Sequence, residues 1–434
     1  MKVKKVKLES LALPEKGAII SGPFGSNISS KFFVEIGVPV IRGNNLCLDY
    51  SKFNDSGFVF ITQEKADELN CWADKEDLLF TAAGTLGQVG ILKEPLNFTR
   101  YVISNKQIRV RLDITKVNPL YAYYWFSSPW MFKRIAGVNK GSTVPLLTLA
   151  EIRDLPIFLP ENRSTQDAVV EVLESISNKI ALNKKMNQKL EAMAKHLYDY
   201  WFVQFDFPDK NGRPYKTTGG AMTYNQTLKR EIPTGWGVKN VNDVTTSVRG
   251  VSYSSDDERS KTDSNVVQIL RGNNISGSRF VFDSNDVFVS SDLVAEEQKI
   301  SKFDIVMTMS SGSKEHVGKS ALALYDMPHS FGAFCSKFTP NEEARYFIDC
   351  YLHSEIFIKY IRQTCSGTGI NNLTNGHFDK SLFAWPTEDI LKAFNEKVSA
   401  IYEQRGVIEQ EITRLTALRD KLLPLLMNGQ VTII

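Results

Sequence analysis

Two segments of the chain repeat mainly apolar residues every seven positions, which is the pattern of a helix packed lengthwise against another helix. Positions three residues further on, such as Val172 and Leu418, are expected to complete each apolar face. We interpret the two segments as a paired coiled coil, and two independent helices packed on separate domains are the alternative. The predicted seam residues are Val169, Ile176, Asn183, Leu190 and Leu197 in the first segment, and Phe394, Ile401, Ile408, Leu415 and Leu422 in the second.

Capping signals predict where both helices begin and end. Ser164-Thr165-Gln166-Asp167 resembles a capping box, so the first helix should begin near Ser164. Thr387 is the expected N-cap of the second helix, and Asn428-Gly429 is a stop signal. About forty helical residues span roughly 60 Å, whereas half-sites one turn apart on B-DNA lie roughly 34–36 Å apart. Such a pair could therefore hold two domains on one face of a duplex.

Short runs of β-type residues predict strands outside the helices. In the first half of the chain they span residues 38–41, 58–61, 78–81, 88–92 and 106–112. In the second half they span residues 266–270, 305–309, 319–324 and 331–338. Each set precedes a predicted helix, at 119–136 and at 345–363. The predicted fold class is α+β, with two pseudo-symmetric domains joined by two long helices that form an antiparallel coiled coil.

The two halves of the chain repeat one another. The run Val38–Asn45 reads VPVIRGNN, and Val267–Asn274 reads VQILRGNN. Gly141-Ser142-Thr143 has a counterpart in Gly367-Thr368-Gly369. The predicted boundaries are a first domain at 1–155, a first long helix at 156–204, a Pro- and Gly-rich linker at 205–235, a second domain at 236–385 and a second long helix at 386–434.

Composition excludes several classes of protein. The five cysteines are scattered and odd in number, which argues against a disulfide framework and a zinc cluster. No run of about 18 apolar residues predicts a membrane span, so we expect a cytoplasmic protein. Residues 1–150 hold 19 Lys and Arg against 13 Asp and Glu, and residues 211–386 hold 19 of each. The excess of positive charge in the first part is compatible with a polyanionic partner.

The Arg-Gly-Asn-Asn runs and the small polar loops are the candidate sites of contact with double-stranded DNA. Arg can bind guanine and Asn can bind adenine through two hydrogen bonds, and both can hold phosphate. The alternative is that Gly-Asn-Asn only forms a turn and that the lysines are solvated. The candidates are Ser26, Asn27, Arg42, Asn44, Asn45, Thr85, Lys106 and Lys140 in the first half, and Arg271, Asn273, Asn274, Ser313, Lys314, Lys319 and Thr368 in the second.

Three enzyme signals are weak. Gly312 and Gly318-Lys319-Ser320 resemble a P-loop, but five residues separate the glycines where four are required. Asn118-Pro119-Leu120-Tyr121 resembles an amino-methyltransferase motif without its second proline, so a helix start is the better interpretation. The five histidines show no metal-type spacing. We therefore expect no catalytic residue, metal or cofactor in this chain.

Several motifs in this order resemble the specificity subunit of type I restriction–modification systems. They are the Gly-Pro-Phe-Gly-Ser loop at 22–26, the Arg-Gly-Asn-Asn runs, the step Asp154–Pro160 into the first helix, its weaker copy Lys380–Pro386, and the run Ile232–Trp236. The resemblance covers the whole chain. It implies two target-recognition domains, each reading one half of a split DNA sequence, with the paired helices setting the gap between the halves.

The resemblance also implies partners. Two methyltransferase subunits would dock on this chain, and restriction subunits with translocase activity would join the full complex. S-adenosylmethionine, ATP and Mg would act in those partners, and the target adenine would be flipped out of the duplex for methylation. A coiled-coil scaffold joining two protein-binding domains is the alternative function.

Overall fold

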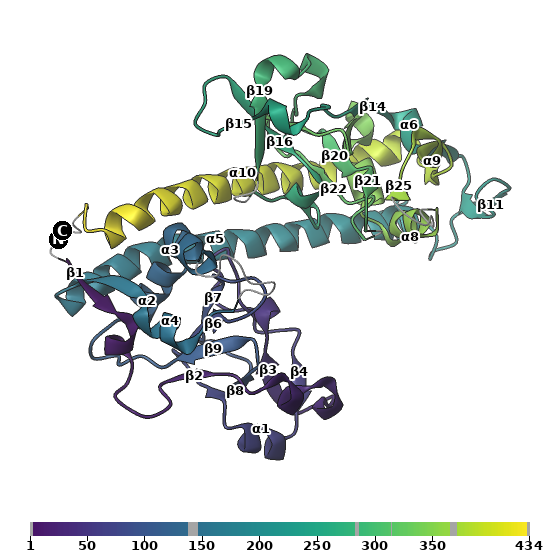
Figure 1. Ribbon diagram of the computed structural model, residues 1–434. Helices are drawn as coiled ribbons and strands as arrows, with labels where there is room; N and C mark the ends of the chain where they lie inside the picture. Colours follow the sequence, from purple (N-terminus) through teal and green to yellow (C-terminus); the bar gives the residue numbers. More distant parts are fainter. Residues whose placement is uncertain (1–2, 138–145, 283–285, 314, 365–370, 432–434) are drawn as a thin grey trace. The chain divides into compact units, whose positions relative to one another are not determined.

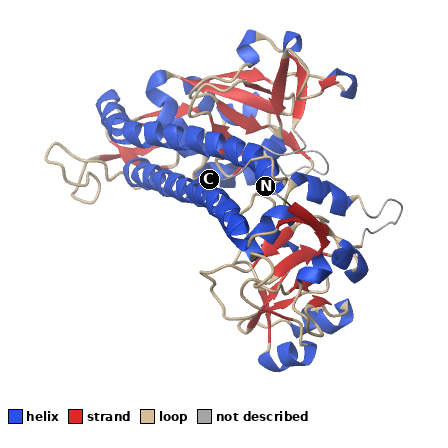
Figure 2. Cartoon of the chain, turned by 90° about the vertical axis from the view of Figure 1, so that its left-hand side faces the viewer, coloured by secondary structure: helices blue, strands red, loops and turns tan. Residues whose placement is uncertain are grey.

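The computed structural model describes residues 3–137, 146–282, 286–313, 315–364 and 371–431. The chain divides into two compact units: unit 1 comprises residues 1–182 and 412–434, and unit 2 comprises residues 183–411. Each unit combines strands with helices, which confirms the predicted α+β class (Figure 1). In both units the strands are flanked by helices (Figure 2).

Among its described residues, unit 1 contains two four-stranded sheets and a two-stranded one. In the first sheet, which is antiparallel, the order is β2 (Ile19–Ser21), β9 (Gln107–Val110), β6 (Leu78–Thr81) and β7 (Val89–Ile91). In the second the order is β4 (Val59–Ile61), β3 (Val38–Ile41), β8 (Tyr101–Ile103) and β5 (Trp72–Ala73), and β3 and β8 are parallel. Strands β1 (Val3–Lys7) and β10 (Pro156–Pro160) pair separately.

Unit 2 repeats the strand order of the antiparallel sheet and of three of the four strands of the mixed sheet, whose fourth strand is added at the opposite edge. Its antiparallel sheet has the order β14 (Thr245–Arg249), β24 (Cys335–Pro340), β20 (Ile305–Thr308) and β22 (Ser320–Leu322). Its mixed sheet has the order β15 (Glu258–Arg259), β19 (Val287–Ser290), β16 (Val266–Leu270) and β23 (His329–Phe331), with β16 and β23 parallel. The pair β13 (Gly237–Asn240) and β26 (Leu382–Trp385) corresponds to β1 and β10. The sequence repeat is thus a repeat of fold.

The helix predicted at 119–136 is two helices, α2 (Pro119–Phe126) and α3 (Pro129–Ala136). The break has a local cause, because Ser128 caps α3 by accepting from the Met131 N–H and Pro129 opens its first turn. The helix predicted at 345–363 is likewise α7 (Arg345–Leu352) and α8 (Glu355–Thr364).

The single strand predicted at 331–338 is also wrong. Its residues belong to β23 and β24, which lie in different sheets and are separated by the turn at 332–334. The segment 205–235, predicted as a linker, contains the hairpin β11 (Met222–Asn225) and β12 (Arg230–Pro233). Phe205 and Phe207 are buried against the Trp236 ring, at 5.4 and 5.3 Å between ring centroids.

Four further short α-helices are α1 (Gln63–Leu69), α4 (Leu149–Asp154), α6 (Val241–Val244) and α9 (Asn375–Asp379). Four two-residue strands are β17 (Ile275–Ser276), β18 (Arg279–Phe280), β21 (Ser310–Ser311) and β25 (Asn371–Asn372). The two long helices are α5 (Arg163–Tyr198), which continues into a π-helical turn at Asp199–Val203, and α10 (Glu388–Met427). Both begin within two residues of the starts that the capping signals predicted, but the predicted boundary at 156 is wrong, because residues 156–160 form strand β10.

The two long helices pair within each unit. In unit 1, Ile176 and Ile180 of α5 form a buried cluster with Leu415 of α10. In unit 2, the Asn187 Nδ2 donates to Glu409 Oε1 at 2.7 Å, and Arg405 Nη2 lies 3.7 Å from Glu191 Oε2. From the first pair to the second, the residue number in α5 increases while that in α10 decreases. The pairing in unit 2 is therefore antiparallel, as predicted.

The second seam position was predicted wrongly. It lies four residues after the first series, at Leu173, Ile180, Asn187 and Ala194, which are all buried. The predicted positions three residues on are more exposed, as for Met193 at 56% and Leu418 at 41%. Of the first series, Val169, Ile176, Asn183, Phe394, Ile408 and Leu415 are buried, and Leu190, Leu197, Ile401 and Leu422 are half-buried. Polar residues at the true second position, including Asn187 and Arg405, hid the pattern.

A buried charged network fixes α10 in unit 2. Asp349 Oδ2 accepts a hydrogen bond from the Tyr402 hydroxyl at 2.7 Å and lies 3.8 Å from Arg405 Nη1. The His353 Nδ1 lies 3.4 Å from Asp349 Oδ1, and its Nε2 lies 3.1 Å from the Ser320 carbonyl oxygen. Burial alone would lower the pKa of His353, but Asp349 and the backbone carbonyls raise it to about 9.

We predict that His353→Gln destabilises the protein more at pH 6 than at pH 9.5. The pKa of His353 rises from 6.5 to about 9 on folding, so its protonation stabilises the fold fully below pH 6.5 and this contribution disappears as the pH rises to about 9. The shift corresponds to about 3 kcal/mol. Urea denaturation of the full chain at both pH values measures it, with the exposed His196→Gln as the control. An equal loss at both pH values would contradict the prediction.

Candidate nucleic-acid interface

Each Arg-Gly-Asn-Asn run forms the same 3-10 turn at the end of a strand. After β3, the Arg42 N–H donates to Asn45 Oδ1 at 2.9 Å. After β16, the Arg271 N–H donates to Asn274 Oδ1 at 3.0 Å. The amide of the last asparagine therefore closes the turn, and the arginine is placed at its start.

Asn45 and Asn274 do not fit the predicted role in DNA contact. Asn45 is fully buried, and its Nδ2 donates to the carbonyl oxygens of Asn54 and Ser56 at 2.8 and 2.9 Å. Asn274 is 1% exposed, and its Nδ2 donates to the Val281 carbonyl oxygen and to Asp286 Oδ1. Both amides are used to close the turn and to hold the segment that follows it, which fits the alternative, structural role considered for Gly-Asn-Asn.

A polar cleft of about 640 Å³ lies in unit 1 at the ends of the strands of both sheets. It brings together four of the predicted residues, Arg42, Asn44, Thr85 and Lys106, from three separate loops. The full lining is Ile28, Phe33, Val40, Arg42, Gly43, Asn44, Thr81, Ala83, Gly84, Thr85, Gln88, Ser104, Asn105, Lys106 and Gln107.

The cleft presents hydrogen-bond donors. The Arg42 Nη2 makes only a long contact, 3.5 Å to the Gly57 carbonyl oxygen, and its Nε is buried without a partner among the described residues. The Ser104 hydroxyl donates to Gln107 Oε1, and the Gln107 Nε2 has no partner among those residues. Unsatisfied buried donors are costly, so this lining suits a ligand rich in acceptors, such as phosphate or the edge of a base.

The other candidates are spread more widely. Ser26 and Asn27 are exposed on the 3-10 turn Gly25–Ile28, whose last residue lines the cleft. In unit 2, Asn273 and Ser313 are exposed, and the Lys319 Nζ lies 3.0 Å from His316 Nδ1. Lys140, Lys314 and Thr368 lie outside the described residues.

Sequence reasoning missed Gln88, Asn105 and Gln107, which also line the cleft. Gln88 accepts from the Thr81 hydroxyl at 3.2 Å, and Gln107 is the register partner of Thr81. Gln88 opens one predicted strand, Asn105 directly precedes another, and Gln107 is the second residue of that strand. Pairing the predicted strands into sheets would have brought them to the same edge as Arg42.

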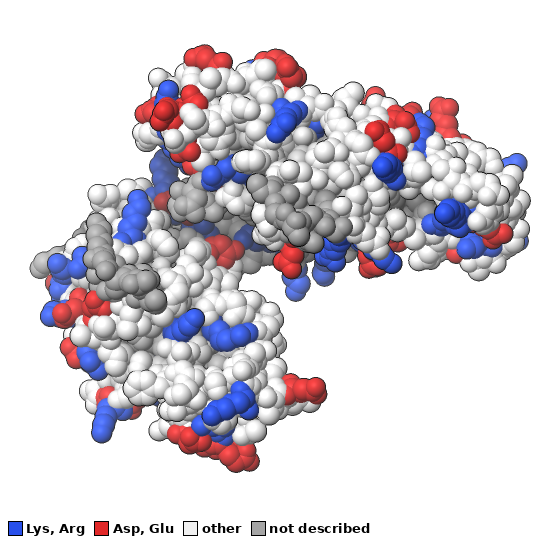
Figure 3. Space-filling model, turned by 45° about the vertical axis from the view of Figure 1, so that its right-hand side comes forward, with Lys and Arg blue, Asp and Glu red and all other residues white. Residues whose placement is uncertain are grey.

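Charge is mixed on the surface. On the face drawn in Figure 3, Lys and Arg side chains are interspersed with Asp and Glu and do not gather in one continuous patch. The described residues of this face therefore carry mixed charge rather than one broad positive surface.

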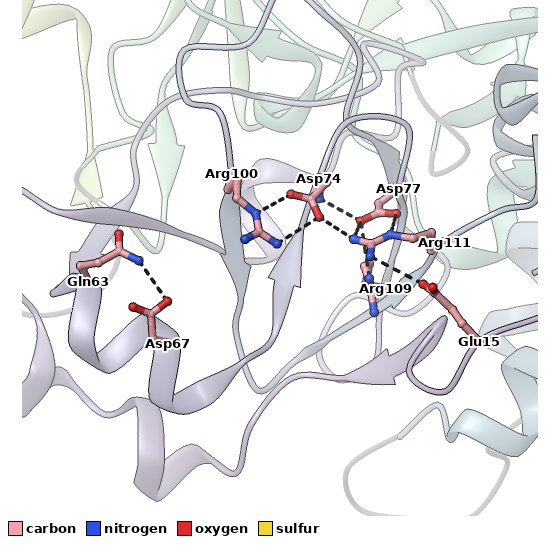
Figure 4. Close-up of polar contacts among 8 residues, drawn as sticks. All are labelled: Glu15, Gln63, Asp67, Asp74, Asp77, Arg100, Arg109 and Arg111. Atoms are coloured by element: carbon pink, nitrogen blue, oxygen red, sulfur yellow. Dashed lines mark hydrogen bonds and ion pairs between the residues drawn. The ribbon is translucent and has the colours of Figure 1, made fainter. Parts of the chain in front are cut away.

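A cluster of opposite charges joins the start of β6 to the end of β9, two strands whose other ends line the cleft (Figure 4). Asp77, just before β6, is 2% exposed and lies 3.0 Å from Arg111 Nη2 and 3.8 Å from Arg109 Nη1. The Asp74 carboxylate lies 2.6 Å from Arg111 Nη2 through its Oδ2 and 2.7 Å from Arg100 Nε through its Oδ1. Burial raises the pKa of Asp77 and the two nearest arginines oppose that shift, so the charged carboxylate depends on them.

Other chemistry is not evident in the part of the chain that the structure describes. No group of three or more His, Cys, Asp or Glu side chains there could hold a metal ion. None of the helices among those residues is long and apolar enough to cross a membrane. The P-loop-like Lys319-Ser320 leads into strand β22, whereas a P-loop leads into a helix.

Comparisons with known proteins point to one family. Residues 27–192 match the family described as type I restriction modification DNA specificity domain. The chain is 34% identical over 208 residues to the StySPI specificity subunit of Salmonella potsdam, a match that covers 46% of this chain and 44% of that protein. It is 25% identical over 370 residues to the MjaIX specificity subunit of Methanocaldococcus jannaschii, covering 83% and 78%.

The match to the first of these relatives thus spans less than half of that relative's length. The fold is similar to that of the type I restriction–modification S subunit from M. genitalium, with a TM-score of 0.53 and 14% identity over 98% of this chain and 96% of that one. This structural likeness agrees with the fold inferred from the repeat.

We predict that Asn45→Ala destabilises unit 1 by about 1–3 kcal/mol, because it leaves buried backbone groups of the turn unsatisfied. Asn44→Ala, at the exposed neighbouring position, should change stability by less than about 0.5 kcal/mol. Thermal denaturation of both variants makes the comparison. Equal stability of the two would show that the buried amide does not hold the turn.

We also predict that Asp77→Ala destabilises the protein by about 3–5 kcal/mol, because the buried Arg109 loses its nearest anion. Asp67→Ala is the matched control, since Asp67 is an exposed aspartate bonded only to Gln63 in Figure 4. Denaturant titration compares the two. A loss under about 1 kcal/mol for Asp77→Ala would contradict a structural role of the cluster.

Proposed function

Since residues 27–192 match the family described as type I restriction modification DNA specificity domain, we propose that this chain is the non-catalytic DNA sequence-recognition subunit of a type I restriction–modification complex. The observation that carries the proposal is the cleft of unit 1. It gathers Arg42, Asn44, Thr85 and Lys106 beside donors that have no partner among the residues that the structure describes.

Two half-sites follow from the duplication. Both units carry an arginine at the start of the same 3-10 turn, after the same strand of the same mixed sheet. Each unit would therefore present one arginine to its own short stretch of sequence. A chain with two such units would bind a bipartite site, with bases between the halves that it does not read.

The long helices would set the number of those bases. Each of α5 and α10 contributes residues to both units, since the division between units falls at 182/183 and at 411/412. A paired helix has a fixed rise of about 1.5 Å per residue. The helix pair would thus hold the two recognition units at one spacing along the duplex.

Catalysis would belong to partner subunits. Two methyltransferase subunits would dock on this chain and modify adenine with S-adenosylmethionine, and restriction subunits using ATP and Mg would join through them. The absence of a recognisable catalytic set in the sequence supports this division of labour. The same division would place the protein in the cytoplasm, where its DNA lies.

Selection from a random duplex library tests the proposal. The full-length chain, purified with its methyltransferase partner, should enrich a bipartite sequence, and Arg42→Ala and Arg271→Ala should each lower its affinity about tenfold. Binding should also weaken steeply as salt rises. Lys210→Ala, at an exposed residue outside the strands, is the control.

Enrichment of no sequence, with equal binding by the two arginine variants, would sink the proposal. It would favour the scaffold alternative, in which the helices join two protein-binding units. Capture of a protein partner unaffected by both arginine variants would then be the expected finding.

A further inference from the structure

The connection between the two sheets forms an equivalent tight turn in both units. In unit 1 the turn runs from Ser104 to Gln107 between β8 and β9, and the Gln107 N–H donates to the Ser104 carbonyl oxygen at 3.1 Å. In unit 2 it runs from Gly332 to Cys335 between β23 and β24, and the Cys335 N–H donates to the Gly332 carbonyl oxygen at 2.8 Å. We call the two central residues of each turn its tip.

Backbone hydrogen bonds hold the two tips in equivalent positions of their units. Ser104 N–H donates to the Ile41 carbonyl oxygen at 3.0 Å, and Gly332 N–H donates to that of Leu270 at 2.9 Å. Ile41 and Leu270 directly precede the two arginines of the Arg-Gly-Asn-Asn turns. The parallel pairing of β3 with β8, and of β16 with β23, therefore sets each tip beside its arginine.

The other side of each turn is also equivalent. The carbonyl oxygen of Lys106 accepts from Ala82 N–H at 2.7 Å, and that of Phe334 accepts from Met309 N–H at 2.8 Å. The backbone hydrogen bonds around the two turns are therefore equivalent. The same backbone in both units cannot by itself distinguish one base sequence from another.

The side chains of the tips differ completely. Unit 1 presents Asn105 and Lys106, which are both exposed and line the cleft that contains Arg42. Unit 2 presents Ala333 and Phe334, and Phe334 is 68% exposed although it is a large aromatic residue. One tip can make hydrogen bonds to a base edge, and the other can make only apolar contacts with it.

We propose, building on the function proposed above, that the tips determine the base specificity of the two units. The Asn105 amide would read adenine through its N6 and N7 atoms, which is the pairing that an asparagine side chain fits. Phe334 would contact the 5-methyl group of thymine, an apolar feature of the major groove. Arg42 and Arg271 would bind their half-sites in the same way. Because the tips differ, the two units would prefer different sequences in the two half-sites.

Base analogues test the proposal atom by atom. The preferred duplex is made with 7-deazaadenine, which lacks N7, or with uracil, which lacks the methyl group, in one half-site at a time. The wild-type chain should lose about tenfold in affinity from 7-deazaadenine in one half-site and about fivefold from uracil in the other. Asn105→Ala should abolish only the first sensitivity, and Phe334→Ala only the second.

Matched controls separate a specific effect from a loss of fold. Asn178→Ala and Tyr224→Ala remove an exposed asparagine of unit 1 and an exposed tyrosine of unit 2, away from the tips, and should keep both sensitivities. If the two tip variants also keep both sensitivities, the inference is wrong while the proposed function stands. If the wild-type chain selects no sequence at all, the proposed function fails and this inference fails with it.

Discussion

The packing of α5 against α10 is the interaction on which both units depend. The core of unit 1 contains Val169 and Leu173 of α5 together with Leu423, Leu426 and Met427 of α10. Burying each such side chain contributes about 1.5–3 kcal/mol. Unit 1 therefore lacks part of its core until the last segment of the chain has joined it.

Unit 2 is built in the same way from the opposite ends of the helices. Ala194 and Tyr198 of α5 lie in one core with Phe394, Val398 and Tyr402 of α10. Because this pairing is antiparallel, the start of α10 meets the end of α5 in unit 2. Polar seam contacts such as Asn187 with Glu409 require one register, since a shift would leave buried polar groups without partners.

The sequence predicted what depends on local pattern and on repetition. The duplication, the α+β class, the strands 38–41, 78–81 and 266–270 and the long helices all follow from periodicity and match the structure. The errors arose where tertiary context decides. The true second seam position was missed because buried Asn187 and Arg405 look like surface residues in a sequence.

The candidate site shows the same division. Arg42 and Asn44 could be singled out because their motif occurs twice, but motif repetition could not tell exposed Asn44 from buried Asn45. Gln88, Asn105 and Gln107 could be placed at the cleft only from the strand pairing, which no local signal gives.

The measurement that tests the central claim most directly adds one heptad to each long helix, after Leu182 and after Glu411, and maps the selected DNA sequence. An added rise of about 10 Å should lengthen the unread gap by about three base pairs and leave both half-sites unchanged; an unaltered gap would contradict the account.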